Sequence, residues 1–274
     1  LFAVALIAAA CFIYVERRAG EPILPLGLYR KRTIVAITLG VFCQGAMMMP
    51  LLSYFPVFAT AVLGFGSAYG FLTTLLLSVT AGAAVFSFLH QRFSYAALIL
   101  SSKSLGVFAM LMIVAVGFEA PVWYLAGLLI LLGFAGLGPL MSVAQNEMAA
   151  ILEARALGTG SSLIGFWRNI GNVIGTTLTA AIVNAGYSRS LAGSAAYASA
   201  PPETRAVMEN PDALIGGAAA GLSASEADAM HGALAAAIDG GFLVIAAFGT
   251  LGAVSALAAG SVRNIRRSRP PMVN

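Results

Sequence analysis

The sequence predicts an all-α protein, a polytopic bundle of helices that crosses a membrane. Of its 274 residues, 59% are apolar and only 9% are charged, and the mean hydropathy is +0.90. Soluble domains carry about 25% charged residues, and a surface this poor in charge would expose large apolar patches to water. Several intervals without Asp, Glu, Lys or Arg are also long enough for a bilayer-spanning helix, which needs about 20 residues.

The charge-free intervals place the elements in order. The chain opens in an apolar stretch, residues 1–15, which has neither a basic leader nor a cleavage site, so we interpret it as the end of a linker transmembrane helix. A basic connection at 16–33 leads into a transmembrane bundle at 34–262. Six complete spans are expected in this bundle, near 34–58, 68–89, 95–117, 122–145, 161–185 and 240–262.

One connection, at about 186–239, is long and rich in Ala, Gly, Ser and Pro, so we expect an outer loop there. Within it, Ser223 and Glu226 have the spacing of a capping box and predict a short helix toward Ile238. We interpret His231 on this helix as a solvated side chain, with a pH-sensing group as the alternative.

The basic residues predict the orientation, because loops rich in Lys and Arg stay on the cytoplasmic side. Two arginines, Arg189 and Arg205, fall on one side of the predicted bundle. Eleven basic residues fall on the other: Arg17, Arg18, Arg30, Lys31, Arg32, Arg92, Arg155, Arg263, Arg266, Arg267 and Arg269. We therefore expect a cytoplasmic carboxyl terminus and a basic cytoplasmic tail at 263–274. Membrane retention explains this tail, so nucleic acid is not an expected partner.

Polar residues within the spans are the candidate functional groups, because an ionisable group at membrane depth needs a partner or an aqueous cavity. The fifth span carries five of them at the spacing of one helical face: Ser161, Arg168, Asn172, Thr176 and Thr179. We predict that this face lines a substrate cavity or packs against polar groups. Snorkelling of Arg168 to the headgroups is the alternative.

Further candidates lie on other spans. Lys103 is a second ionisable group at membrane depth, with snorkelling an equal alternative, and Gln44, Gln145 and Asn146 are uncharged hydrogen-bonding candidates. Small residues and prolines predict close helix contacts or bends: Gly171 and Gly175 for contact, and Pro50, Gly136, Gly138 and Pro139 for hinges.

Motifs of catalysis are absent from the sequence. It contains no His-Glu-x-x-His, no Gly-x-Ser-x-Gly, no phosphate-binding loop and no acidic cluster for a metal. The two cysteines, Cys11 and Cys43, lie in apolar runs and form no metal-binding pattern. We therefore expect no enzyme, no metal site and no cofactor.

Several segments together carry a family resemblance by their order and spacing: Glu16–Arg18, Glu21–Leu26, Leu28–Arg30, Gly64–Ala68, Gly70, Gly133, Gly136, Gly138 and Gly165–Gly175. They resemble the fourteen-helix drug:proton antiporters of the major facilitator superfamily, the EmrB/QacA type. The last segment is similar to the Arg-x-x-Gly-x-x-x-Gly helix of that family. Asn172 departs from the pattern, since many relatives have a glycine there.

The resemblance implies that the chain is the C-terminal six-helix half of a major facilitator fold, with part of a preceding helix. It implies alternating access between two bundles, driven by protons, in the inner membrane of a bacterium. The implied partners are a small amphipathic substrate, protons, the lipid bilayer, an N-terminal half encoded upstream, and, as a candidate, a periplasmic adaptor. An exporter of one specific metabolite and a non-transporting membrane subunit remain as alternatives.

Overall fold

The computed structural model describes residue 14 and residues 26–64, 69–116, 121–153, 156–214 and 221–259. The described residues form helices and no strand, which confirms the all-α class. A helix satisfies its backbone polar groups internally, as a span in lipid requires. The predicted span at 1–15 lies outside the described residues except for Tyr14. Residues 16–25 of the connection and the predicted tail at 263–274 also lie outside them.

In chain order the elements are η1 (Leu26–Arg30), α2 (Arg32–Val57), η2 (Phe58–Val62), α3 (Tyr69–Leu89), α4 (Tyr95–Val116), α5 (Val122–Leu131), η4 (Leu132–Leu137), α6 (Gly138–Ile151), α7 (Leu157–Ala192), α8 (Ala195–Ser199), α9 (Pro202–Met208), η6 (Pro211–Leu214) and α10 (Ala224–Ala258). Elements η1 and η6 are 3-10 helices, whereas η2 and η4 are π-helical. The segment α5–η4–α6 is continuous.

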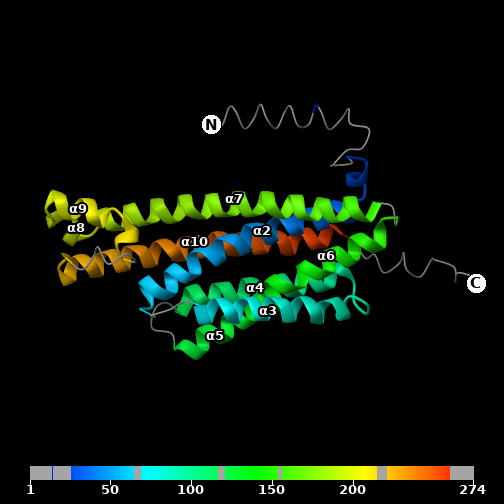
Figure 1. Cartoon of the computed structure of the whole chain (residues 1–274), viewed down its shortest axis with the longest axis horizontal. Helices are drawn as coiled ribbons and strands as arrows, with labels where there is room; N and C mark the ends of the chain where they lie inside the picture. Colours follow the sequence, from blue (N-terminus) through cyan, green and yellow to red (C-terminus); the bar gives the residue numbers. More distant parts are fainter. Residues whose placement is uncertain are drawn as a thin grey trace, which may run out of the picture.

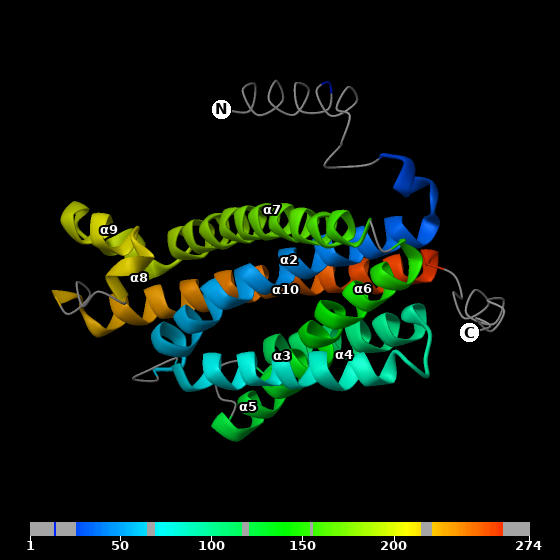
Figure 2. The same ribbon diagram turned by 45° about the vertical axis from the view of Figure 1, so that its right-hand side comes forward.

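Two groups of helices are visible in Figures 1 and 2, α2 with α7 and α10, and α3 with α4 and α6. Contacts between α4 and α10 join the groups.

Five segments of the described chain are long and apolar enough to cross a membrane: Arg32–Val62, Tyr69–Leu89, Tyr95–Val116, Val122–Ile151 and Ala224–Ala258. They match five of the six predicted spans. The sixth is α7, which has 36 residues, but its polar stripe lowers its hydropathy. The turn that ends the first segment includes Gly64, whose φ of 70° is a conformation that favours glycine.

The outer connection at 186–239 is a correction, because much of it is helical. Helix α7 continues to Ala192, and α10 begins at Ala224, with α8, α9 and η6 between them. The predicted capping box is present: the Ser223 N–H donates to Glu226 Oε2 at 2.8 Å, and the Glu226 N–H donates to Ser223 Oγ. The alanine-rich residues that follow are strong helix formers, so the helix runs unbroken into the last span.

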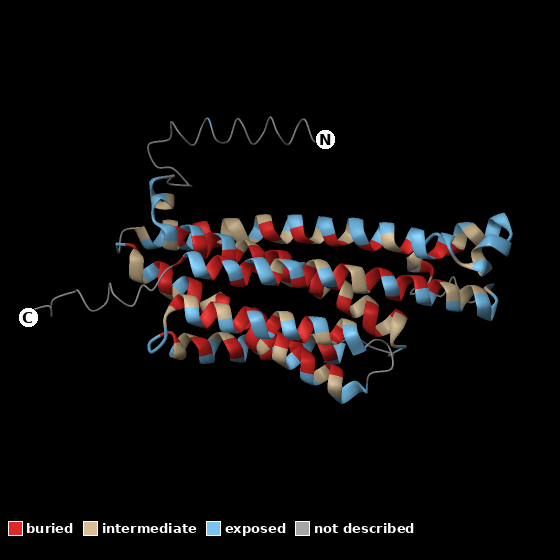
Figure 3. Ribbon diagram, turned by 180° about the vertical axis from the view of Figure 1, so that it is seen from behind, coloured by how far each residue is buried: buried red, intermediate tan, exposed pale blue. Residues whose placement is uncertain are grey.

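The bundle has two distinct ends. We call the one that carries Lys31, Arg32 and Arg92 the basic end, and the one with α8 and α9 the opposite end. Apolar side chains point outward along the helices, as expected for a lipid-facing surface; Trp123 is 75% and Phe88 is 71% exposed. Figure 3 shows buried residues on the inward sides of the helices and exposed residues on their outer sides.

The core consists of two apolar clusters that occupy different ends. One surrounds Phe55 and Phe242 toward the opposite end, and the other surrounds Ile37 and Leu140 toward the basic end. Between the clusters, the helices contribute polar side chains and glycines instead of large apolar residues. This layer contains two of the predicted site residues, Lys103 and Gln44.

Candidate functional site

A buried polar layer joins α2, α4 and η4 between the two apolar clusters. Lys103 on α4 is 0% exposed, and Gln44 on α2 is 1% exposed. The Lys103 ammonium donates hydrogen bonds to Gln44 Oε1 and, at 2.8 Å, to the Gly136 carbonyl oxygen. The Gln44 amide in turn donates to the Leu137 carbonyl oxygen at 2.6 Å. The two side chains therefore form one connected hydrogen-bond network.

Irregular backbone at η4 explains why carbonyl oxygens are available to these donors. A π-helical turn departs from the regular ladder, and the acceptors, Gly136 and Leu137, both belong to η4. A buried polar group without a partner is costly, so donors from Lys103 and Gln44 stabilise this segment. Within the described ranges Lys103 forms no ion pair, and its hydrogen bonds go to an amide oxygen and a carbonyl oxygen.

The structure decides between the alternatives for these residues. Lys103 does not snorkel, because its ammonium lies in the bundle interior. Neither Lys103 nor Gln44 reaches an open surface of the described chain, so both remain candidates for substrate contact or proton coupling from within the buried layer. Of the residues predicted as a hinge, Gly136 lies in the π-helical segment η4, and Gly138 and Pro139 begin α6 directly after it. Helix α2 continues through Pro50 to Val57.

The polar stripe of α7 runs beside α6, and we call this region the α6–α7 seam (Ser161, Arg168, Asn172 and Thr176 of α7, with Met141 and Gln145 of α6). Ser161 donates a hydrogen bond to Gln145 at 3.2 Å, and the Arg168 guanidinium contacts the Met141 sulfur at 3.7 Å. Arg168, Asn172 and Thr176 are half-buried, while Ser161 is exposed. These polar groups therefore stay partly open.

Thr179 is separate from this seam. Its side chain is fully buried, and a Cβ at Gly241 of α10 would lie 3.1 Å from its methyl carbon. Its hydroxyl has no hydrogen-bond partner within the described part of the chain. Thr179 thus faces α10, because it lies on the side of α7 that packs into the bundle.

Glycines bring α2 and α7 into backbone contact, as predicted for Gly171 and Gly175. A Cβ at Gly171 would overlap the Phe42 carbonyl oxygen, and one at Gly175 would overlap the backbone of Ala46. Gly45 of α2 makes the reciprocal contact with α7 and had no distinguishing sequence signal beyond its size. Asn172 does not prevent this approach: a Cβ at Gly45 would lie 2.9 Å from the Asn172 backbone nitrogen, and the residue itself is half-buried.

A second set of glycines packs α3 and α4 against η4 and α6. A Cβ at Gly106 of α4 would lie 2.5 Å from the Gly136 Cα, and one at Gly138 would lie 2.5 Å from the Val79 carbonyl oxygen. The glycines interpreted as hinges are therefore also points of close helix contact. Their packing brings the carbonyl oxygen of Gly136 to Lys103.

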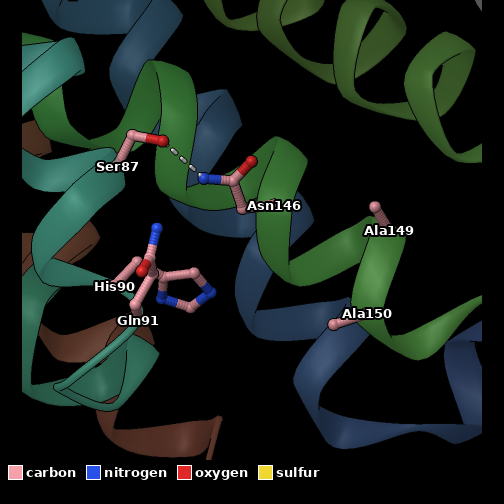
Figure 4. A pocket seen from close by; sticks show the side chains of 6 residues that line it. All are labelled: Ser87, His90, Gln91, Asn146, Ala149 and Ala150. Carbon is pink, nitrogen blue, oxygen red and sulfur yellow. Dashed lines mark hydrogen bonds between the residues drawn. The ribbon is translucent and has the colours of Figure 1, made fainter.

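The sequence analysis missed a cluster at the basic end, between α3 and α6. His90 Nε2 lies 3.0 Å from Glu147 Oε2, and their side chains are only 7% and 5% exposed. Next to this pair, the Asn146 amide donates to Ser87 Oγ at 2.9 Å (Figure 4). Asn146 is a predicted candidate, whereas His90 and Glu147 are not among the predicted site residues. Their similar depth on two different spans was the signal that could have paired them.

The connection before α2 docks on α7. The Trp167 indole N–H donates to the Tyr29 hydroxyl oxygen at 2.5 Å, which ties η1 to the start of α7. Burial raises the pKa of Tyr29, and the hydrogen bond from Trp167 offsets part of this effect. The basic end of the seam is thereby held by a contact from outside the spans.

Comparison with known proteins shows which family this chain belongs to. The sequence matches the Major Facilitator Superfamily over residues 1–176. The chain belongs to the major facilitator superfamily. For this superfamily member, the matched region includes the polar layer, the His90–Glu147 pair and the α6–α7 seam. Membership and the apolar helices identify an integral membrane protein of a transporter family.

Two relatives are named for drug transport. The chain is 25% identical over 187 residues to the multidrug transporter protein MdtP of Bacillus subtilis (strain 168), covering 68% of this chain and 34% of that protein. It is 27% identical over 180 residues to multidrug resistance protein 3 of the same organism, covering 65% and 35%. The aligned part of the chain thus spans about a third of each relative.

Proposed function

We propose that the chain is the carboxyl-terminal half of a proton-coupled exporter of small amphipathic compounds, of the fourteen-helix EmrB/QacA type. Its partners would be the amino-terminal half, protons, the lipid bilayer and a substrate, with a periplasmic adaptor as a further candidate. The membrane would be the bacterial cytoplasmic membrane, with the basic end inside. The names of the two relatives and the one-third coverage support this proposal.

The observation that carries the proposal is the α6–α7 seam. Its half-buried polar groups lie on a helix that otherwise exposes apolar side chains, such as Val173 at 67%. A guanidinium at this depth needs water or polar partners, and one of its contacts is the soft Met141 sulfur. A second six-helix bundle placed over the seam would enclose these groups in a shared aqueous cavity, where Arg168 meets the substrate.

The test is efflux by the complete protein in cells, with ethidium as a lipophilic-cation probe and a panel of peptides, siderophores and amino acids beside it. Arg168→Ala is expected to lower ethidium efflux at least tenfold at unchanged membrane abundance. Arg168→Lys should retain part of it, because a cation remains. Thr177→Ala is the matched control, since Thr177 is exposed on the same helix and bonds only to its own backbone. Wild-type efflux by Arg168→Ala would refute the role of Arg168, and transport of one panel metabolite alone would refute the multidrug substrate class.

A further inference from the structure

The His90–Glu147 pair is a buried ionisable pair that connects two helices. His90 follows the last residue of α3, and Glu147 lies in the last turns of α6. Nε2 and Oε2 lie 3.0 Å apart, within the distance of an ion pair, but the contact lacks the geometry of a hydrogen bond. His90 Nδ1, His90 Nε2 and Glu147 Oε1 have no hydrogen-bond partner within the described residues, so three buried polar atoms have unused hydrogen-bonding capacity.

An open pocket of about 430 Å³ borders His90, whose ring nitrogens are themselves buried, and Glu147 lies behind its lining. The pocket is lined by Ser87, His90, Gln91, Asn146, Ala149 and Ala150. Figure 4 shows the imidazole of His90 beside Gln91, with the α6 residues across the pocket. Because the pocket is at the basic end, its water would belong to the cytoplasm under the predicted orientation.

The surroundings leave His90 as the principal partner for the carboxylate. Within the described ranges it is the one basic side chain that contacts Glu147. From α4, the buried Tyr95 interacts electrostatically with Glu147, and its hydroxyl has no hydrogen-bond partner there. The other charged groups on the packed elements are Arg168 of α7, bonded to Met141, and the exposed Lys31, Arg32, Arg92 and Glu153.

These contacts make the pair sensitive to one proton. With the imidazole protonated, the pair is an ion pair of zero net charge. When the Nε2 proton passes to pocket water, the imidazole is neutral and the carboxylate keeps its charge, so the pair has a charge of −1. A buried charge without a partner is strongly disfavoured, and separation of the helix ends would hydrate it.

We propose that His90 and Glu147 form a proton-binding site that links proton release at the basic end to separation of α3 from α6. The protonated pair holds the two helix ends together, and the deprotonated pair opens them to water. This inference rests on the proposed proton-coupled transport and assigns it a coupling site within this bundle. No electron transfer is involved, and water in the pocket accepts the proton.

The first test measures the distance between the helix ends in the complete protein in lipid nanodiscs. Spin labels are placed at Arg92→Cys and Ala149→Cys, both exposed, with the native cysteines replaced by serine. Between pH 5.5 and pH 8.5, the population with the longer distance should grow at least threefold. Glu147→Gln should keep the short distance at every pH, because no charge is left unpaired. His90→Gln should favour the long distance at both pH values.

A matched control separates this effect from general loosening. Ser142 of α6 donates to the Ala83 carbonyl oxygen of α3 at 2.6 Å, a contact between the same helices that does not titrate. Ser142→Ala should therefore keep the pH response. A pH response that persists in both Glu147→Gln and His90→Gln would overturn the inference, as would its absence from the wild-type protein.

The second test is transport in proteoliposomes of the complete protein with ethidium as the probe. Glu147→Gln should lose uphill, gradient-driven transport at least tenfold while keeping ethidium exchange without a gradient. Retained gradient-driven transport by this variant would overturn the coupling role. If the wild-type protein moves no ethidium under a proton gradient but the distance responds to pH as expected, the proposed function fails and the proton site stands.

Discussion

Lys103 shows how a buried amine is accommodated in the interior of a membrane bundle by hydrogen bonds to uncharged acceptors. Its ammonium meets an amide oxygen from α2 and a backbone oxygen from η4. Its aliphatic stem packs beside Gly252 of α10, where a Cβ would lie 3.8 Å from Lys103 Cδ. One side chain thus contacts three of the helices around it. The contribution of Lys103 to the free energy of unfolding depends on Gln44, because Gln44 accepts a hydrogen bond from Lys103 and donates one to Leu137 of η4.

At this scale we expect strong coupling between the two residues. Gln44→Leu should lower the free energy of unfolding by about 2–3 kcal/mol, because it takes an acceptor from the buried amine of Lys103. Adding Lys103→Met to this variant should recover part of the loss, since the buried polar group that lost its acceptor is then gone. Thermal and denaturant unfolding of the purified protein in detergent measures both effects. If the changes in the free energy of unfolding caused by the two substitutions simply add, Lys103 and Gln44 are not coupled in one network.

At the scale of elements, backbone contact through glycine decides how the helices pair. Without a hydrophobic force between helices in lipid, close van der Waals packing is a main source of association. Helix α7 uses Gly171 and Gly175 against α2, while α4 and η4 meet through Gly106 and Gly136. Close backbone contact at glycines therefore holds the helices together in both groups. The polar network lies where the second of these contacts brings η4 to α4.

Gly171→Ala should destabilise the protein by about 3 kcal/mol, because the added methyl group overlaps the Phe42 carbonyl oxygen and forces α2 from α7. Gly165→Ala on the same helix is the matched control. A Cβ there has nothing within 4 Å, so this substitution should be neutral or stabilise by about 0.5–1 kcal/mol through helix propensity. The unfolding midpoint in detergent distinguishes the two. Equal midpoints for the two variants would argue against backbone contact at Gly171.

A second element-scale feature lies at the opposite end, where α10 extends beyond its span. His231 Nδ1 lies 2.6 Å from the Ala61 carbonyl oxygen in η2, although the residue itself is exposed. The histidine interpreted as merely solvated therefore contacts a π-helical segment. The Tyr187 hydroxyl donates to the Met208 carbonyl oxygen at 2.6 Å, which holds the short α9 to α7. Through these contacts, the segments at the opposite end pack against the bundle and do not form an extended loop.

At the scale of the whole molecule, the alternation of helix directions places all described turns at one of two ends. The turn with Arg92 lies at the basic end, and Glu203 of α9 lies at the opposite end, with both residues exposed. Under the positive-inside rule, the basic end faces the cytoplasm. The same orientation would let the His90–Glu147 pocket exchange protons with the cell interior.

Single-cysteine labelling in the complete protein checks this orientation. A membrane-impermeant maleimide should react with Glu203→Cys in intact spheroplasts, and with Arg92→Cys only after the membrane is opened. Arg189→Cys on the outer part of α7 serves as a second outside position. Labelling of Arg92→Cys from outside would reverse the assignment of both ends.

The composition and local spacing of the residues were enough to predict the membrane class, the spans that the structure describes, the start of α10 at Ser223 and the contact face of Gly171 and Gly175. Each depends on the length of an apolar run or on helical periodicity within one segment. Only the tertiary structure decided that Lys103 meets Gln44 and the Gly136 carbonyl oxygen, that His90 meets Glu147, and that Thr179 turns away from the seam. These outcomes depend on how each helix is rotated and shifted against its neighbours. That arrangement results from packing among all the helices together, so no single segment encodes it.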